Sequence, residues 1–293
     1  MKIIAENINV MSKTLGPAMK ERNAAPILKV AEECVAKKVD WIDVNIGPAR
    51  KGGAEMMEWL VKTIQTVSKD IPLSLDTTNL DAMEGGLKVH KGRPLINSVS
   101  LQPERTDRGI QLAKTYDADV ICLLWGKDGM PRDENERAVH VVDFYTKAMD
   151  VGIAPERIYV DPIASPVCVE VNQIRSALEF MSMLPEIAPG VKSTIGLSNV
   201  SNGAPDDLRH WLNRTYAVML IANGLASAIV DLYDDALHAI ARGQRKDIED
   251  VVMSVVHGKP VATDDLSEEL MKYYKSARVL KGEILYSHSW LAV

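Results

Sequence analysis

The most informative part of the chain reads Ser193-Thr-Ile-Gly-Leu-Ser-Asn-Val-Ser-Asn-Gly203. Its apolar residues Ile195 and Leu197 are followed at once by small, uncharged polar residues, and Pro205-Asp-Asp207 then begins a helical pattern. Proline in the first turn and carboxylates near the positive end of the helix dipole both favour a helix start. The stretch therefore predicts a strand, a polar loop and a helix. Such residues also fill ordinary loops, so this loop alone does not identify a site.

The same order of strand, polar loop and helix is repeated along the chain. Apolar runs predict strands at 2–9, 39–47, 72–78, 93–100, 119–125, 158–163, the run ending at Leu197, and 226–232. Apolar residues at i, i+3 and i+4 spacing predict helices that begin near Pro26, Glu55, Leu80, Arg105, Asp133, Val171 and Pro205.

Eight strands that alternate with helices through short loops predict an α/β fold, namely a (β/α)8 TIM barrel. A doubly wound sheet is the alternative, but it requires a glycine-rich G-x-G-x-x-G turn after its first strand. Here that strand ends in Glu6-Asn-Ile-Asn9. We expect the barrel to cover residues 1–258. Helical patterns fill 236–256, and a charged helix at 264–281 predicts a C-terminal helical extension, residues 259–293, packed on the barrel.

Composition narrows the class of protein. The chain has 293 residues, of which 46% are hydrophobic and 25% charged, as in ordinary soluble proteins. Its net charge is -6 without a dense basic run, which argues against nucleic acid as a partner. The longest apolar run, 216–230, is interrupted by Asn223 and Gly224 and is shorter than the ~20 residues of a membrane span. Three isolated cysteines suit a reducing compartment. We expect a cytoplasmic protein with no membrane partner.

Polar side chains gather where the predicted strands end. In a TIM barrel the catalytic residues lie at these carboxyl ends, which together with the following loops we call the rim. The rim is expected to contain few cations and many carboxylates, amides and hydroxyls: Glu6, Asn7, Asn9, Asp43, Asn45, Asp76, Thr77, Asn79, Asn97, Ser98, Ser100, Asp161, Ser198, Asn199, Asn202 and Asp231. Buried polar groups require partners. Some of these pair with each other or cap helices, but the whole set favours a neutral ligand rich in hydrogen-bond donors.

Other reactive residues point away from metal or covalent chemistry. All six histidines are predicted in helices or the tail, so a zinc site on the rim is not expected. Cys122 is expected in the core, and Cys168 near the rim without a histidine partner. Lys127 is the one lysine placed for a Schiff base, but it lies in a solvated turn. The acidic end of the eighth strand, 231–235, would repel a phosphate.

Four of these strand ends resemble the pterin-binding (β/α)8 barrels, most closely the methyltetrahydrofolate:corrinoid (iron-sulfur) protein methyltransferases. The most specific match is Gly196-Leu-Ser-Asn-Val-Ser201, and the resemblance covers about 1–258 but not the extension. The matching residues are Asp76 in Ser74-Leu-Asp-Thr-Thr-Asn79, Asn97 in Ile96-Asn-Ser-Val-Ser100, Asp161 in Val160-Asp-Pro162, and Asn199. Asn7-Ile-Asn9 and Asp43-Val-Asn45 fit the first two strand ends.

The resemblance implies a methyltransferase that moves the N5 methyl group between methyltetrahydrofolate and the cobalt of a corrinoid (cobalamin). The corrinoid would be carried by a partner protein, and the enzyme would be a homodimer with no metal of its own. Asn199 and Asp161 are the implied catalytic residues. The implied pterin-binding residues are Asp76, Asn97, Asp161, Asn199, Asn7, Asp43, Ser198 and Asn202.

Two alternatives stay open at this point. Dihydropteroate synthase shares the barrel and the pterin carboxylates, but that family has cationic residues at the seventh and eighth strand ends. Here these ends read Asn199-Val-Ser-Asn202 and Asp231-Leu-Tyr-Asp234. The other alternative is a folate- or corrinoid-binding subunit without its own chemistry. The direction of methyl transfer and the identity of the corrinoid protein are not determined by the sequence.

Overall fold

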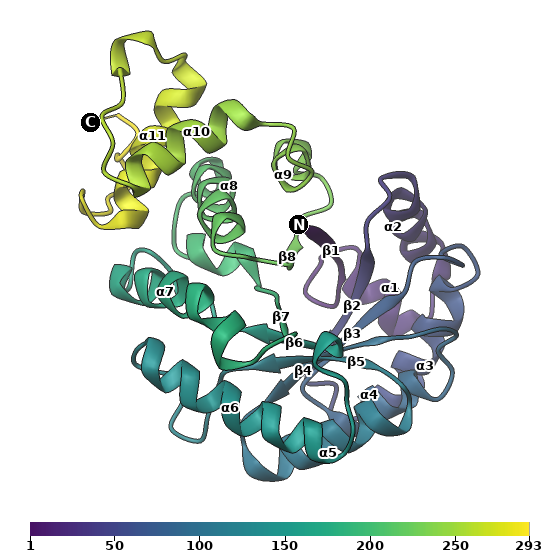
Figure 1. The fold of residues 1–293 in the computed structure, drawn as a ribbon. Coiled ribbons are helices and arrows are strands. Elements are labelled where there is room, and N and C mark those ends of the chain that lie inside the picture. Colours follow the sequence, from purple (N-terminus) through teal and green to yellow (C-terminus); the bar gives the residue numbers. More distant parts are fainter. Residues whose placement is uncertain (293) are drawn as a thin grey trace.

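The computed structural model describes residues 1–292. Its eight parallel strands form one sheet in the order β7-β6-β5-β4-β3-β2-β1-β8, with helices around it (Figure 1). The strands are β1 (Lys2–Asn9), β2 (Trp41–Gly47), β3 (Leu73–Thr77), β4 (Leu95–Ser100), β5 (Asp119–Leu123), β6 (Ile158–Asp161), β7 (Lys192–Ser193) and β8 (Ser227–Val230). The predicted α/β TIM barrel is therefore confirmed.

The helices match the predicted apolar spacing at most positions. They are α1 (Leu15–Glu21), α2 (Ala24–Ala36), α3 (Gly53–Ile64), α4 (Leu80–Leu87), α5 (Pro103–Thr115), α6 (Glu134–Asp150), α7 (Val171–Ile187), α8 (Asp206–Ala222), α9 (Asp235–Ala241), α10 (Lys246–Val256) and α11 (Glu268–Lys281), with short 3-10 turns η1 (Pro155–Arg157), η2 (Leu197–Ser201) and η3 (Thr263–Asp265). Polar N-caps begin several of them. Asn79 Oδ1, for example, accepts from the backbone N–H groups of Asp81 and Ala82 at the start of α4.

One helix, α1, differs from the prediction. The sequence pattern does not indicate α1, because it is short and contains glycine and proline. Its Gly16 is required by a close approach, since a Cβ there would lie 2.3 Å from the carbonyl oxygen of Val10. The helical patterns predicted at 236–256 form two helices, α9 and α10, and the chain turns between them at Gly243 in the left-handed region (φ 71°).

The barrel is nearly closed where the two edge strands of the sheet, β7 and β8, meet. Strand β7 is only two residues long, and beyond it a single parallel bridge joins Gly196 to Ile229. The backbone N–H of Ile229 donates to the carbonyl of Ile195 (2.8 Å). The prediction that the seventh strand extends to Leu197 is wrong, because the polar residues there form η2, where the Ser201 hydroxyl satisfies the carbonyl of Ser198 (3.0 Å).

The interior of the barrel changes from apolar to polar along its axis. Near the amino ends of the strands, five buried side chains form a separate apolar cluster: Ile4, Trp41, Leu95, Ile121 and Tyr159. The rings of Trp41 and Tyr159 meet edge to face with centroids 5.8 Å apart. These buried side chains occupy the interior near the amino ends of the strands.

The C-terminal helix α11 packs against other helices. Helix α11 contacts α7, α8 and α10, and Figure 1 shows α10 and α11 together beside α8. Trp290 is 2% exposed, and its indole N–H donates to the hydroxyl of Ser276 (3.0 Å), which fixes the end of the described chain to α11. None of the helices within residues 1–292 is both long and apolar enough to cross a membrane.

Candidate active site

A hydrogen-bonded cluster joins the middle parts of the neighbouring strands β2, β3 and β4. The carboxylate of Asp43 accepts from the hydroxyl of Ser74 (2.6 Å) and from Nδ2 of Asn97 (3.0 Å). Asp43 is 1% exposed, and this burial raises its pKa to about 6. Because Asn97 gives its NH2 group to Asp43, its carbonyl oxygen is the end left to accept from a ligand.

Asp76 at the end of β3 is held by a neighbouring amide. Nδ2 of Asn45 donates to the Asp76 carboxylate, while Oδ1 of Asn45 accepts from the backbone N–H of Gly47 (2.9 Å). Burial, followed by the charge of Asp43, raises the pKa of Asp76 well above its usual range. A ligand that donates N–H bonds to Asp76 would compensate for this burial and favour the ionised carboxylate.

Asp161 at the end of β6 is the third buried carboxyl group. It is 7% exposed, and its Oδ1 accepts from the backbone N–H of Ile163 (2.8 Å). Burial outweighs this hydrogen bond and raises the pKa of Asp161 to about 6. Near neutral pH the group is therefore mostly ionised, yet it can take up a proton within the range in which an enzyme works.

The η2 loop brings the predicted amides to the rim. Nδ2 of Asn202 donates to Oδ1 of Asn199 (3.2 Å), and both side chains are exposed. The hydroxyl of Ser198 donates to the Glu6 carboxylate (3.4 Å), which connects the loop to β1. The structure therefore places Ser198, Asn199 and Asn202 in one loop beside the end of the first strand.

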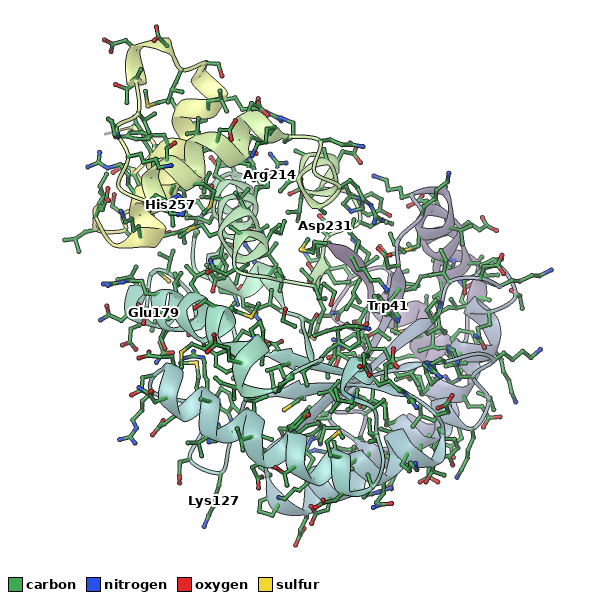
Figure 2. All side chains as sticks on the ribbon, viewed as in Figure 1. Trp41, Lys127, Glu179, Arg214, Asp231 and His257 are labelled. Carbon is green, nitrogen blue, oxygen red and sulfur yellow. The ribbon has the colours of Figure 1, made fainter. Side chains whose placement is uncertain are left out.

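Asn7 has a different set of partners from the other predicted residues. Its Nδ2 donates to Asp231 Oδ1 (2.7 Å), and its Oδ1 accepts from the backbone N–H of Leu232 (2.7 Å). Asn7 therefore joins the ends of β1 and β8, and its role toward a ligand stays a prediction. Asp231 lies beside β8 in Figure 2.

Glu6 belongs to this site although the sequence analysis placed it only on the rim. Burial, and after it the charges of Asp231 and Asp43, raise its pKa to about 7 against the hydrogen bond from Ser198 and the charge of Arg209. A glutamate at a strand end is an ambiguous signal. Glu6 is identified by its neighbours Ser198 and Asp231, which come from the later part of the chain. They lie beside Glu6 only once the barrel has closed.

The expectation of few cations at the rim is wrong. Three arginines come from the helices rather than from the strand ends, and each donates to backbone carbonyls near the site. Arg105 of α5 donates to Ser98 (3.2 Å), Arg209 of α8 to Ser198 (3.1 Å), and Arg137 of α6 to Pro162 (2.9 Å). Arg137 is fully buried. These long side chains start in the first turns of the helices and extend back to the loops. The sequences of the strand ends alone therefore do not reveal them.

The histidines, cysteines and Lys127 lie mostly as predicted. His90 and His257 are exceptions, because they follow α4 and α10 rather than lying within a helix. Nε2 of His90 accepts from the backbone N–H of Leu73 (3.2 Å) at the amino end of β3, away from the rim. Cys122 is buried, as predicted, and Cys168 lies against the carbonyl of Asn202 (3.1 Å). Lys127 extends away from the ribbon (Figure 2). Within the part of the chain that the structure describes, no cluster of three or more His, Cys, Asp or Glu residues is placed to hold a metal ion.

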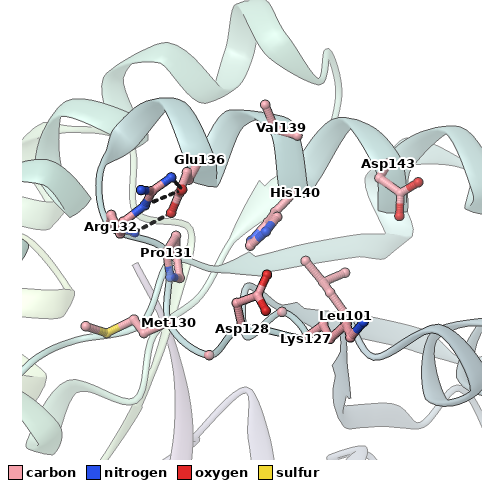
Figure 3. A pocket seen from close by; sticks show the side chains of 12 residues that line it. Leu101, Lys127, Asp128, Met130, Pro131, Arg132, Glu136, Val139, His140 and Asp143 are labelled. Atoms are coloured by element: carbon pink, nitrogen blue, oxygen red, sulfur yellow. Dashed lines mark hydrogen bonds and ion pairs between the residues drawn. The ribbon is translucent and has the colours of Figure 1, made fainter.

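A cavity of about 830 Å³ lies between the loop 126–132, which follows β5, and helix α6 (Figure 3). Its lining mixes Lys127, Asp128 and Asp143 with His140 and apolar groups. The charges of both signs give this cavity no clear ligand preference. It contains none of the strand-end residues described above.

The raised pKa of Glu6 predicts a pH-dependent stability. Between pH 4.5 and about 7 the folded protein holds a proton on Glu6 that the unfolded chain releases, so the free energy of unfolding should fall as pH rises through 7. The upper limit is on the order of 3 kcal/mol, since one pKa unit corresponds to about 1.4 kcal/mol. Urea unfolding of wild type and Glu6→Gln at pH 5 and pH 8 measures it. The variant should gain stability relative to wild type at pH 8, and an equal difference at both pH values would contradict the assignment.

Comparison with known proteins is consistent with this site. The family described as pterin binding enzyme matches residues 6–231. The chain is 24% identical over 233 residues to the methylcorrinoid:tetrahydrofolate methyltransferase of Eubacterium limosum, covering 79% of this chain and 85% of that protein. It is 27% identical over 240 residues to methionine synthase of Mycobacterium leprae (strain TN), covering 78% of this chain but 20% of that protein.

Solved structures show the same fold. The dihydropteroate synthase of Thermus thermophilus superposes with a TM-score of 0.59 at 18% identity, over 82% of this chain and 93% of that one. At this identity the likeness concerns the barrel and not the reaction. The family match spans every strand end that contributes to the site, from Glu6 to Asp231. The chain therefore belongs to the pterin binding enzyme family.

Proposed function

We propose that the protein is a methyltransferase that moves a methyl group between N5 of methyltetrahydrofolate and the cobalt of a corrinoid carried by a separate protein. The observation that carries the proposal is the uncharged amide of Asn199 on the rim loop, in a barrel whose other strand ends supply the buried carboxyl groups of Asp76 and Asp161. The relative named as a methylcorrinoid:tetrahydrofolate methyltransferase supports the same reading.

The buried groups suit the pyrimidine edge of a pterin. That edge presents N–H donors, and carboxylates accept them in charge-assisted hydrogen bonds. Asn97 adds an acceptor of fixed orientation, because its NH2 group is engaged by Asp43. The pterin would enter from the rim and stop above the apolar layer around Trp41 and Tyr159.

The transfer step needs help at N5. When the methyl group moves to cobalt(I), cobalt supplies both electrons of the new bond, and the electron pair of the broken C–N5 bond stays on N5, which takes a proton. A tertiary amine is a poor leaving group, so a donor aimed at N5 lowers the activation barrier of this step. Asn199 would supply that donor, and Asp161 or water the proton.

Dihydropteroate synthase is the alternative that the shared fold supports. Its substrate carries a pyrophosphate, which favours cations at the ends of β7 and β8. Here the end of β8 carries Asp231 and Asp234, and Asp234 already pairs with Arg214 (2.8 Å). This acidic end disfavours the synthase reading.

We infer a corrinoid protein as partner, a homodimer, a cytoplasmic location, no metal of the enzyme's own, and residues 259–293 as an extension packed on the barrel.

Three measurements on the purified protein separate the alternatives. Methyltetrahydrofolate with cob(I)alamin should give methylcobalamin, followed by its absorption spectrum. Dihydropteroate formed from aminobenzoate and a pterin pyrophosphate, without methylcobalamin, would instead indicate the synthase. Folate binding measured by calorimetry, with neither product, would indicate a non-catalytic subunit.

A further inference from the structure

The loop that carries Asn199 is bound by one arginine of the following helix. Nε of Arg209 in α8 donates to the hydroxyl of Ser201 (3.0 Å), and its Nη2 donates to the carbonyl of Ser198 (3.1 Å) and to Oδ1 of Asn202 (3.1 Å). A guanidinium group has donors and no acceptor. The end of the Asn202 amide that faces Arg209 must therefore be its oxygen.

This fixes the direction of the next hydrogen bond. With its oxygen toward Arg209, Asn202 presents its NH2 group to Asn199, and Nδ2 of Asn202 lies 3.2 Å from Oδ1 of Asn199. A primary amide has one acceptor end and one donor end. The oxygen of Asn199 is thus engaged, and its NH2 group is the end left for a ligand.

The position of that NH2 group is set by a glycine. A Cβ built on Gly196 would lie 3.0 Å from Nδ2 of Asn199, so the amide nitrogen occupies space that a side chain at 196 would take. Gly196 also forms the single bridge that closes the barrel against Ile229. The donor end of Asn199 therefore lies against the closing point of the barrel.

We propose that Arg209 and Asn202 are positioning residues that determine which end of the Asn199 amide faces the ligand. This inference rests on the proposed methyl transfer. A donor stabilises the electron pair left on N5, whereas an amide oxygen at the same place repels it. We call the hydrogen bonds from Arg209 to Asn202 and from Asn202 to Asn199 the relay. Without the relay, rotation of the Asn199 amide by 180° would exchange its two ends.

Asn202→Asp tests the direction of the relay without removing the loop contacts. One carboxylate oxygen of the variant still accepts from Arg209, while the other faces Asn199 and can only accept. The Asn199 amide should turn over, donate its NH2 group to residue 202 and present its oxygen to N5. A purely structural role for Arg209 and Asn202 predicts no loss of rate here, because the loop keeps its anchor.

Single-turnover methyl transfer and folate calorimetry measure the effect. In Asn202→Asp the rate constant should fall about 10²-fold, comparable to removal of an oxyanion donor, while the folate Kd stays within about threefold. In the Asn199→Ala background the same substitution should have no further effect, because Asn202 acts through Asn199. Arg209→Lys keeps a donor and should retain more activity than Arg209→Leu. Asn135→Asp, an exposed change in the first turn of α6, serves as the matched control.

Two results of the kinetic measurements would overturn the inference. One is an Asn202→Asp rate within threefold of wild type, and the other is an equal drop in both backgrounds. If the wild type itself transfers no methyl group, the proposed function fails, and the relay is then judged by NMR of asparagine-labelled protein. The side-chain NH2 signals of Asn199, assigned by their loss in Asn199→Ala, should shift in Asn202→Asp and stay in place in Asn135→Asp. Unchanged signals in Asn202→Asp would reject the relay.

Discussion

Asn199→Ala is expected to slow methyl transfer at saturating folate by roughly two to three orders of magnitude, with little change in folate affinity. Before transfer, N5 is a weakly basic tertiary amine that gains little from a donor. As the C–N5 bond breaks, electron density builds on N5, and a preoriented N–H group becomes more valuable at that moment. Because Asn199 cannot titrate, the variant should keep the pH profile of the wild type.

Stopped-flow transfer and equilibrium binding separate the two effects. Asn199 is exposed and its backbone N–H donates to the carbonyl of Gly196 at the start of η2 (3.3 Å), so truncation of the side chain leaves the loop backbone bonds in place. A matched control is Asn135→Ala, which also removes an exposed amide but lies on α6. If Asn199→Ala loses folate affinity while the saturated rate is unchanged, Asn199 is a binding residue and the N5 role belongs to another group.

Asp161→Ala should weaken folate binding by about 1.5–3 kcal/mol, which corresponds to roughly 10- to 150-fold in Kd. The carboxylate is buried and accepts from Ile163, so its loss removes a charge-assisted acceptor for the pterin. Asp161→Asn keeps the shape and an acceptor for Ile163. It separates the loss of charge from the loss of packing.

The pH dependence of binding gives a second measure of the same residue. The pKa of Asp161 is raised to about 6, so lowering the pH through 6 protonates it and removes an acceptor from the ligand. Folate affinity should therefore decrease below pH 6 in wild type and depend less on pH in Asp161→Asn. Asp107→Ala, on the exposed face of α5, is the control. An unchanged Kd in folded Asp161→Ala would exclude Asp161 from the pterin site.

The barrel could be predicted because its signal is repeated. Each apolar run ends in polar residues before a helical pattern, and no single error in length changes the count. The short β7 and the 3-10 turn η2 could not be read from the sequence, because both strand and turn accept Gly196 and Leu197. Whether these residues form a strand or a 3-10 turn depends on local hydrogen bonds such as the one between Ser201 and Ser198.

The positions of the strand-end side chains were also predictable, but their hydrogen-bond partners were not. Sequence reasoning found Asp43 and Asn97 as separate members of the rim, whereas the structure joins them by a direct hydrogen bond. Such pairs depend on the register between strands. Arg137 and Arg209 were missed because an arginine in a helical pattern is usually a solvated surface residue, and only the packed structure shows what each guanidinium binds.

Label transfer tests the central claim most directly. Methyltetrahydrofolate carrying a trideuterated N5 methyl group is mixed with the protein and cob(I)alamin, and both products are quantified by mass spectrometry. We expect trideuteromethyl-cobalamin and tetrahydrofolate in equal amounts, formed at a rate that depends on the protein and falls in Asn199→Ala. Folate that binds the protein but keeps its label, with no labelled cobalamin above the protein-free control, would contradict the account.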